Sequence, residues 1–180
     1  MIKNITVYCA SNNRIDNIYF KETDILGKML GQRKMHIING AGNIGLMRAI
    51  TDAVLSTGGK VTGVIPEFMV DRGLCHPKLT TVIQTQTMHE RKKMMADLSD
   101  AVIALPGGYG TMEELLEIIT WRQLGLYKKP IIILNTNNFY GSLLEMFSRI
   151  VVEKFVRDEH VQLWQVVQTP QEAINLIDRL

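Results

Sequence analysis

The sequence alternates short β-branched segments with longer amphipathic ones, and this order constrains the fold more than any other feature. The short segments, which we expect to be strands, are residues 5–8, 35–38, 61–65, 81–83, 101–105 and 131–134, with one more near Val166. The longer segments carry apolar residues at helical spacing and cover residues 17–31, 45–57, 87–98, 111–124 and 140–154, with a terminal helix from Pro170. Strands separated by helices are typical of a parallel sheet.

Most of the predicted strands are apolar throughout and do not alternate with polar residues. This pattern indicates strands that are buried on both sides, in a sheet covered by helices on both faces. We therefore predict an α/β fold, with a single Rossmann-like three-layer domain over residues 1–180. In such folds ligands bind in the crevice beyond the carboxyl ends of the strands.

The composition argues against several classes of protein. A net charge of +2 is too small to favour nucleic acid or a membrane surface as a partner. Cys9 and Cys75 have no paired spacing, which argues against a disulfide framework and against a zinc site. No apolar run reaches membrane-spanning length, and the first predicted strand follows the N-terminus directly. We therefore expect no signal peptide and a cytoplasmic location.

Two predicted strands end in glycine-rich loops that open helices. The first loop is Asn39-Gly40-Ala41-Gly42-Asn43-Ile44-Gly45, and the second is Leu105-Pro106-Gly107-Gly108-Tyr109-Gly110-Thr111. Glycine lets a ligand approach the backbone closely, and the helix N-terminus behind each loop offers free N–H groups at its positive end. Such loops favour a bound phosphate, although each could also be a simple tight turn between a strand and a helix.

The first loop also fits the dinucleotide fingerprint G-x-G-x-x-G through Gly40, Gly42 and Gly45. Glu67 lies at about the distance at which that fingerprint has an acidic residue. A nicotinamide-dependent enzyme is therefore one alternative. The second loop is not part of this fingerprint, so the two glycine-rich loops together favour a site other than a dinucleotide site.

Glu114 follows Thr111 at the spacing of a capping box, in which the two residues close each other's free N–H groups. Thr87 and Glu90 repeat this spacing at another predicted helix start. The capping reading places Glu114 in the first helical turn, beside the second glycine loop. A carboxylate at that position can cap the helix, take part in a reaction, or do both.

Three cations, Arg91, Lys92 and Lys93, lie close to the start of their predicted helix, where they oppose its dipole. For the two lysines a solvated basic face is the alternative to a function. Arg91 is the best candidate for function, because its planar fork suits a carboxylate or a phosphate.

These residues occur in two motifs that resemble the signatures of the Lonely Guy (LOG) family. The motifs are Met88-His89-Glu90-Arg91-Lys92 and Pro106-Gly107-Gly108-Tyr109-Gly110-Thr111-Met112-Glu113-Glu114, the latter matching P-G-G-x-G-T-x-x-E. Residues 7–11, 40–47, 63–66 and 120–125 extend the similarity, and it thins after about Val151. Ala10 and Ala41 stand where the family usually has glycine.

The resemblance implies hydrolysis of cytokinin riboside 5′-monophosphates, or of AMP in related members, to a free base and ribose 5-phosphate. It implies that Arg91 and Glu114 are catalytic. The residues that it implies bind the substrate or its phosphate are Ser11, Gly42, Gly45, Met88, Arg91, Lys92, Gly107, Gly108, Tyr109, Gly110, Thr111 and Glu114. The chemistry agrees, because a carboxylate can stabilise the positive ribose that forms as the base departs. We expect no metal and no cofactor.

Two further expectations concern partners and rivals. The predicted helix at 111–124 has apolar residues on more than one face, and LOG-like proteins form homodimers, so we expect a homodimer. Molybdenum-cofactor carrier proteins are similar in fold and glycine loops, so a nucleotide or cofactor carrier without catalysis is an alternative. The label lysine decarboxylase is also attached to this family, but the sequence has no recognisable pyridoxal-lysine motif.

Overall fold

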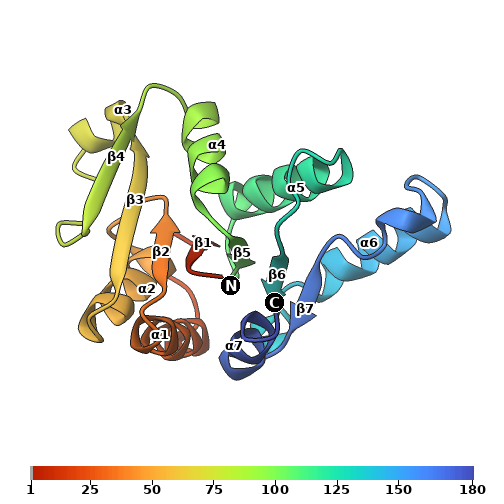
Figure 1. Ribbon diagram of the computed structural model, residues 1–180, viewed down its shortest axis with the longest axis horizontal. Helices are drawn as coiled ribbons and strands as arrows, with labels where there is room; N and C mark the ends of the chain where they lie inside the picture. Colours follow the sequence, from red (N-terminus) through yellow and green to blue (C-terminus); the bar gives the residue numbers. More distant parts are fainter. Residues whose placement is uncertain (1) are drawn as a thin grey trace.

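A computed structural model describes residues 2–180, and within them seven strands form one sheet in which every hydrogen-bonded pair of neighbours is parallel (Figure 1). The strand order is β4-β3-β2-β1-β5-β6-β7. The strands are β1 (Asn4–Tyr8), β2 (His36–Asn39), β3 (Lys60–Pro66), β4 (Thr81–Thr85), β5 (Ala101–Ala104), β6 (Ile131–Leu134) and β7 (Gln165–Val167).

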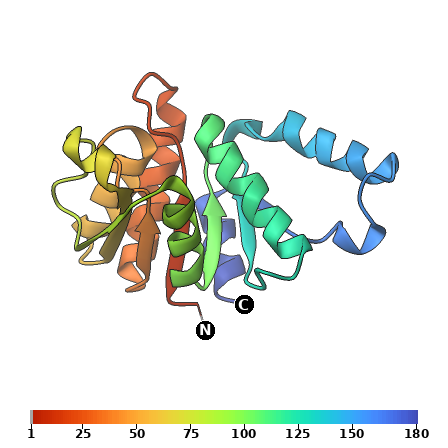
Figure 2. The ribbon, with the colours of Figure 1, turned by 90° about the horizontal axis from the view of Figure 1, so that it is seen from above.

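Helices cover both faces of the sheet, which makes three layers (Figures 1 and 2). One face carries α1 (Asn17–Gln32), α2 (Gly45–Ser56) and α7 (Pro170–Ile177), and the other carries α4 (Met88–Leu98), α5 (Tyr109–Gln123) and α6 (Gly141–Val152). The predicted α/β three-layer fold with a parallel sheet is therefore confirmed. No sequence pattern predicted the short helix α3 (Glu67–Asp71) or the two 3₁₀ helices Thr136–Asn138 and Asp158–His160.

Alternating side chains of the five inner strands, β3, β2, β1, β5 and β6, supply two hydrophobic cores. Ile5 and Val7 of β1 pack with α1 and α2, whereas Tyr8 packs with the helices of the opposite face. The same division separates Ile132 from Ile133 in β6. Burial on both faces explains why these strands read as continuous apolar runs.

The direction of winding reverses between β1 and β5. From β1 the chain adds β2, β3 and β4 toward one edge, and β5, β6 and β7 then continue from β1 toward the other edge. At the carboxyl ends of β1 and β5, the segments that follow these two strands therefore diverge and leave a crevice between them. This is the position at which open parallel sheets bind ligands.

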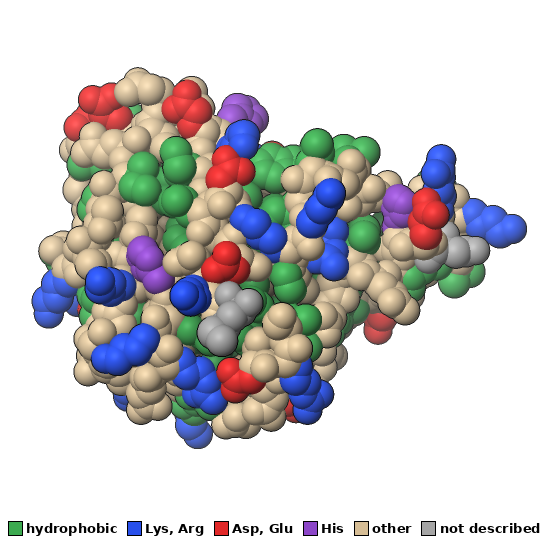
Figure 3. Space-filling view, in the orientation of Figure 1, with side chains coloured by type: hydrophobic (Ala, Val, Ile, Leu, Met, Phe, Trp, Pro, Cys, Tyr) green, Lys and Arg blue, Asp and Glu red, His purple; other side chains and the backbone are tan. Residues whose placement is uncertain are grey.

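Helix α6 and the segment after it extend away from the sheet (Figures 1 and 2), and the extension is the narrow projection in the space-filling view (Figure 3). Phe147 of α6 is buried against the sheet side of this helix. Over the face that Figure 3 shows, basic and acidic side chains are interspersed. Among residues 2–180, no helix is both long and apolar enough to cross a membrane.

Helices α1 and α2 cross closely because two glycines of α1, Gly27 and Gly31, lie at the contact. A Cβ on Gly31 would lie 2.0 Å from Thr57 Oγ1 and 2.7 Å from the backbone oxygen of Val54. The backbone oxygen cannot turn away as a flexible side chain can. Gly31 therefore sets the distance between the two helices.

We expect Gly31→Ala to destabilise the protein by roughly 1–2 kcal/mol, lowering Tm by about 2–8 °C, because the clash outweighs the gain in helix propensity. Thermal melting followed by circular dichroism measures the change. The exposed neighbour substitution Gln32→Ala is the control, with an expected change below about 0.5 kcal/mol. A Gly31→Ala variant as stable as the wild type would show that the helices have room to separate.

Candidate active site

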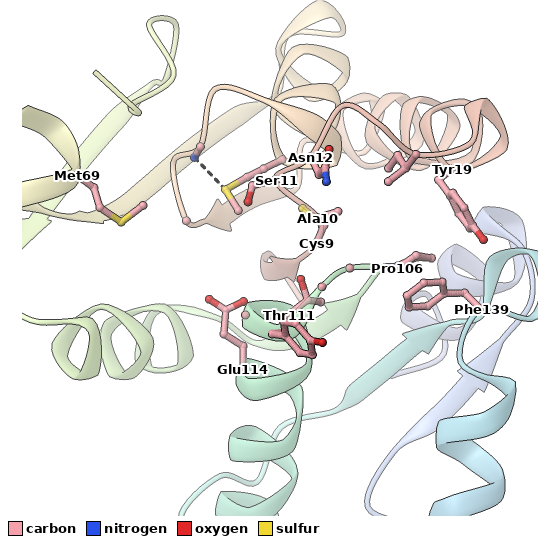
Figure 4. Close-up of a pocket in the computed structure, with 18 of the residues that line it drawn as sticks. Cys9, Ala10, Ser11, Asn12, Tyr19, Met69, Pro106, Thr111, Glu114 and Phe139 are labelled. Atoms are coloured by element: carbon pink, nitrogen blue, oxygen red, sulfur yellow. Dashed lines mark hydrogen bonds between the residues drawn. The ribbon is translucent and has the colours of Figure 1, made fainter. Parts of the chain in front are cut away.

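A cavity of about 620 Å³ lies at the carboxyl ends of β1, β2 and β5, in the crevice where the winding reverses (Figure 4). One wall comes from the loop after β1 and from α1, and the opposite wall comes from the second glycine loop and α5. The lining residues are Cys9, Ala10, Ser11, Asn12, Ile15, Tyr19, Gly40, Gly42, Met47, Met69, Arg91, Pro106, Gly107, Gly108, Tyr109, Gly110, Thr111, Glu114 and Phe139.

The second glycine loop leaves its N–H groups free for a ligand. Helix α5 begins at Tyr109 after the N-cap Gly108, and no side chain caps it. Within residues 2–180, the N–H groups from Gly108 to Thr111 have no hydrogen-bond acceptor. A Cβ on Gly107 would lie 2.1 Å from Thr111 Oγ1, so only glycine lets the loop fold this closely onto the helix. The open N–H groups at the positive end of α5 form an anion site.

The first glycine loop is different, because its N–H groups are largely used within the protein. Gly45 donates to Asn13 Oδ1 at 2.8 Å. Gly45 also has a φ of +65°, and a Cβ there would lie 2.4 Å from the backbone nitrogen of Asn12. The other occupied donors are Ala41 to Asn39 Oδ1, Gly42 to the sulfur of Met47 and Asn43 to the oxygen of Leu74. This loop therefore serves mainly to build the cavity wall, and fewer of its N–H groups than of the second loop's are free for a phosphate.

Thr111 and Glu114 do not form the predicted capping box, because α5 begins two residues earlier than predicted. Thr111 occupies the third helical position, and Glu114 lies beyond the first turn. At α4 a closely related arrangement forms, in which Thr87 Oγ1 accepts from Glu90 N at 3.1 Å and Glu90 accepts from Gln86 N at 2.8 Å. Glu114 is therefore not occupied in closing its own helix and lines the cavity, as Figure 4 shows.

Arg91 and Glu114 form a buried ion pair at the cavity. Arg91 Nη1 lies 3.3 Å from Glu114 Oε1, and the two side chains are only 7% and 8% exposed. Arg91 Nε also donates to the backbone oxygen of Val64 at 3.1 Å. A Cβ on Gly40 would lie 1.7 Å from Arg91 Nη2, so the first glycine loop makes room for the guanidinium.

Burial raises the pKa of Glu114 from 4.5 to about 7, and the charge of Arg91 opposes this rise. The neighbouring carboxylates Glu113 and Glu117 raise this pKa further, whereas Lys92 lowers it. A carboxyl group with this pKa exchanges its proton near neutral pH. Such groups in clefts are frequent at active sites.

Three of the residues predicted to bind the substrate do not line the cavity: Gly45, Met88 and Lys92. Lys92 Nζ instead contacts Glu113 and Glu117 of α5. The predicted residues that do line it are Ser11, Gly42, Arg91, Gly107, Gly108, Tyr109, Gly110, Thr111 and Glu114. Glu67, on which the dinucleotide alternative depended, also lies outside the lining.

Tyr19 and Phe139 form an aromatic end of the cavity that the sequence did not predict. Their rings meet edge to face with centroids 6.0 Å apart, on the side of the cavity away from Met69 (Figure 4). Phe139 follows Asn137 and Asn138, which have φ values of 53° and 55°. Asparagine tolerates this left-handed conformation, so the Asn-Asn pair could have indicated a turn. Nothing in the local sequence indicates that the turn aims an aromatic ring at the site.

Comparison with known proteins finds relatives over nearly the whole chain. A family model described as "Possible lysine decarboxylase" matches residues 47–177. The chain is 39% identical over 176 residues to the probable cytokinin riboside 5′-monophosphate phosphoribohydrolase LOGL2 of Oryza sativa subsp. japonica, covering 98% of this chain and 72% of the relative. It is 40% identical over 174 residues to the cytokinin riboside 5′-monophosphate phosphoribohydrolase LOG4 of Arabidopsis thaliana, covering 97% and 81%.

Solved structures confirm the fold. The molybdenum cofactor binding protein from Rippkaea orientalis superposes with a TM-score of 0.75 at 20% identity, over 99% of this chain and 97% of that one. At this identity the likeness extends to the fold alone. The sequence relatives are much closer and span most of both chains, so the chain belongs to the Lonely Guy (LOG) family.

Proposed function

We propose that the protein hydrolyses the N-glycosidic bond of adenine-type nucleoside 5′-monophosphates, either AMP or an N6-modified cytokinin riboside monophosphate. The products are the free base and ribose 5-phosphate. The observation that carries the proposal is the buried pair of Glu114 and Arg91, one helical turn from a set of free backbone N–H groups. The names of the relatives, which are phosphoribohydrolases, support the same reaction class.

The 5′-phosphate binds at the N-terminus of α5 in this proposal. The free N–H groups from Gly108 to Thr111 face it, and the helix dipole favours its negative charge. Ser11 lies on the opposite wall and offers a hydroxyl group (Figure 4). Binding energy from this remote group places the ribose over Glu114.

Glu114 then acts at the ribose. As the bond between C1′ and the base nitrogen breaks, both electrons leave with the base and positive charge develops on the sugar. The Glu114 carboxylate stabilises this charge and orients a water molecule, whose oxygen bonds to C1′ while a proton passes to the base. Arg91 favours the ionised form of the carboxylate and holds it in place.

Other functions fit the same site less well. A carrier that only captures a phosphate gains nothing from a buried carboxylate beside it, because the like charges repel. A dinucleotide enzyme would use the first glycine loop, but the N–H groups of Asn43 and Gly45 have acceptors within the protein. A pyridoxal-dependent decarboxylase needs a lysine for its Schiff base, and among the described residues no lysine lines the cavity.

We further propose that the protein is a homodimer joined through α5, α6 and the residues after them. Helix α5 is apolar on more than one face. The face that carries Leu115, Ile118 and Ile119 is buried within the chain. The other face remains exposed. The exposed apolar side chains of this region are Leu116, Leu124, Leu126, Met146, Val152 and Phe155. A surface of this kind favours a protein partner.

The activity proposal predicts release of free base from AMP or N6-isopentenyl AMP, and none from the matching nucleosides. We expect Glu114→Gln and Arg91→Ala to lose activity by at least about 100-fold while the fold persists, because each removes charge stabilisation at the sugar. Chromatographic detection of the base gives the rate, and circular dichroism gives the fold. The exposed substitution Glu145→Gln is the control and keeps the wild-type rate. Glu114→Gln hydrolysing at the wild-type rate, or nucleotide binding without base release, would contradict the proposal.

The pH dependence follows from the pKa of Glu114, which is about 7. The ionised form is the active one, so kcat/KM rises as the pH increases through about 7. The substrate phosphate also ionises, with a pKa of about 6. The rise in kcat/KM that comes from Glu114 therefore lies at a higher pH than the rise that comes from the substrate. Initial rates at low substrate between pH 5 and 9 measure the profile. A kcat/KM that is constant between pH 6.5 and 8 would rule out this role for the carboxylate.

The oligomer proposal predicts a dimer in sedimentation velocity at micromolar concentration. Leu124→Glu combined with Phe155→Glu places two charges in the exposed apolar surface, where the side chains are 64% and 82% exposed. We expect this variant to sediment as a monomer. Leu180→Glu, which changes an exposed apolar residue elsewhere, leaves the dimer intact. A wild-type protein that sediments as a monomer would refute the proposed interface.

A further inference from the structure

Lys92 is buried beside the candidate active site, and the proposed reaction does not use it. Its side chain is only 6% exposed, and its ammonium group donates to Glu113 Oε1 and, at 3.0 Å, to Glu117 Oε1. It does not line the cavity. Burial of the ammonium lowers the pKa of Lys92, but the hydrogen bonds to Glu113 and Glu117 outweigh this and raise it. Lys92 is therefore charged at neutral pH.

The position of Lys92 couples it to the proposed catalytic pair. Lys92 follows Arg91 in α4, and Glu113 precedes Glu114 in α5. Two consecutive residues of α4 thus bind consecutive acidic residues of α5, with Glu117 one turn further on. The contacts connect the two helices at the point where Glu114 enters the cavity.

The charges around Glu114 come from three elements. Helix α4 supplies Arg91 and Lys92, and α5 supplies Glu113 and Glu117. Tyr8 at the end of β1 and Cys9 directly after it are also close enough to feel the charge of Glu114, and burial raises the pKa of each well above neutrality, so both are uncharged. Three carboxylates within two turns repel one another, and Lys92 is the cation that contacts the two outside the cavity.

We propose that Lys92 is a positioning residue, which neutralises Glu113 and Glu117 and so sets the charge and orientation of Glu114 without contacting the substrate. The effect of Lys92 on the reaction rate rests on the proposed function, whereas its effect on the titration of Glu114 does not. Glu113 and Glu117 each raise the pKa of Glu114, so their effect grows when the lysine charge is removed. The rival role, direct contact with the substrate as the motif resemblance implied, raises KM at every pH and does not move the rising limb of kcat/KM.

The test is to titrate the Glu114 carboxyl in the free protein by ¹³C NMR of glutamate-labelled samples, with the signal assigned by its loss in Glu114→Gln. We expect Lys92→Met to raise the midpoint by about one pH unit, and Lys92→Arg to restore it, because arginine retains the charge. We expect Glu117→Gln to lower the midpoint, because it removes a repelling charge. This second variant keeps Lys92 paired with Glu113, so it tests the same electrostatics if Lys92→Met does not fold.

Activity gives an independent measurement on the same variants. In Lys92→Met the rising limb of kcat/KM moves with the NMR midpoint, so the rate falls about tenfold at pH 6.5 and recovers above pH 9. An unchanged Glu114 midpoint in Lys92→Met, or in Glu117→Gln where Lys92→Met does not fold, would overturn the proposal. A raised KM with an unmoved limb would overturn it in favour of substrate contact. If the wild type releases no base, the proposed function fails, and the NMR titration still decides the role of Lys92.

Discussion

The site depends on one buried ion pair, formed by Arg91 and Glu114 where the two halves of the sheet diverge. Burying two charges costs free energy, and this pair is supported by a backbone oxygen of β3 and by the space above Gly40. Because the pKa of Glu114 is raised, its contribution to the free energy of unfolding is fully present below 4.5 and is lost as the pH rises through about 7. The protein therefore gives up stability at neutral pH in order to keep an ionised acid in the cavity, which is a common trade at active sites.

The two glycine loops divide the work of making that cavity. In the first loop the glycines allow close packing, as Gly40 does against Arg91 and Gly45 against Asn12, and most of the N–H groups are satisfied within the protein. In the second loop the glycine N-cap leaves the start of α5 uncapped and its N–H groups open. Two loops of similar composition thus do opposite things, because one lies against other backbone segments and the other faces the cavity.

The fold could be predicted from the sequence because burial on both faces makes each strand a short apolar run between helical segments. The second glycine loop, Arg91 and Glu114 could also be predicted, since local motifs indicate their chemistry. What could not be predicted depends on contacts between distant segments. The predicted capping box at Thr111 does not form, because the helix starts at Tyr109. Lys92 contacts Glu113 and Glu117 and not the cavity, because α5 lies beside it. Tyr19 and Phe139 come from opposite halves of the chain, and only the fold brings them together.

The central claim is that residue 114 faces the ribose of a nucleotide whose phosphate is bound at the start of α5. A crystal structure of Glu114→Gln with bound AMP tests it directly, because the substitution slows turnover and keeps the shape of the side chain. We expect phosphate oxygens on the N–H groups from Gly108 to Thr111, with C1′ within about 3–4 Å of the residue 114 side chain. A phosphate bound at the first glycine loop, or a ribose that lies away from residue 114, would contradict it.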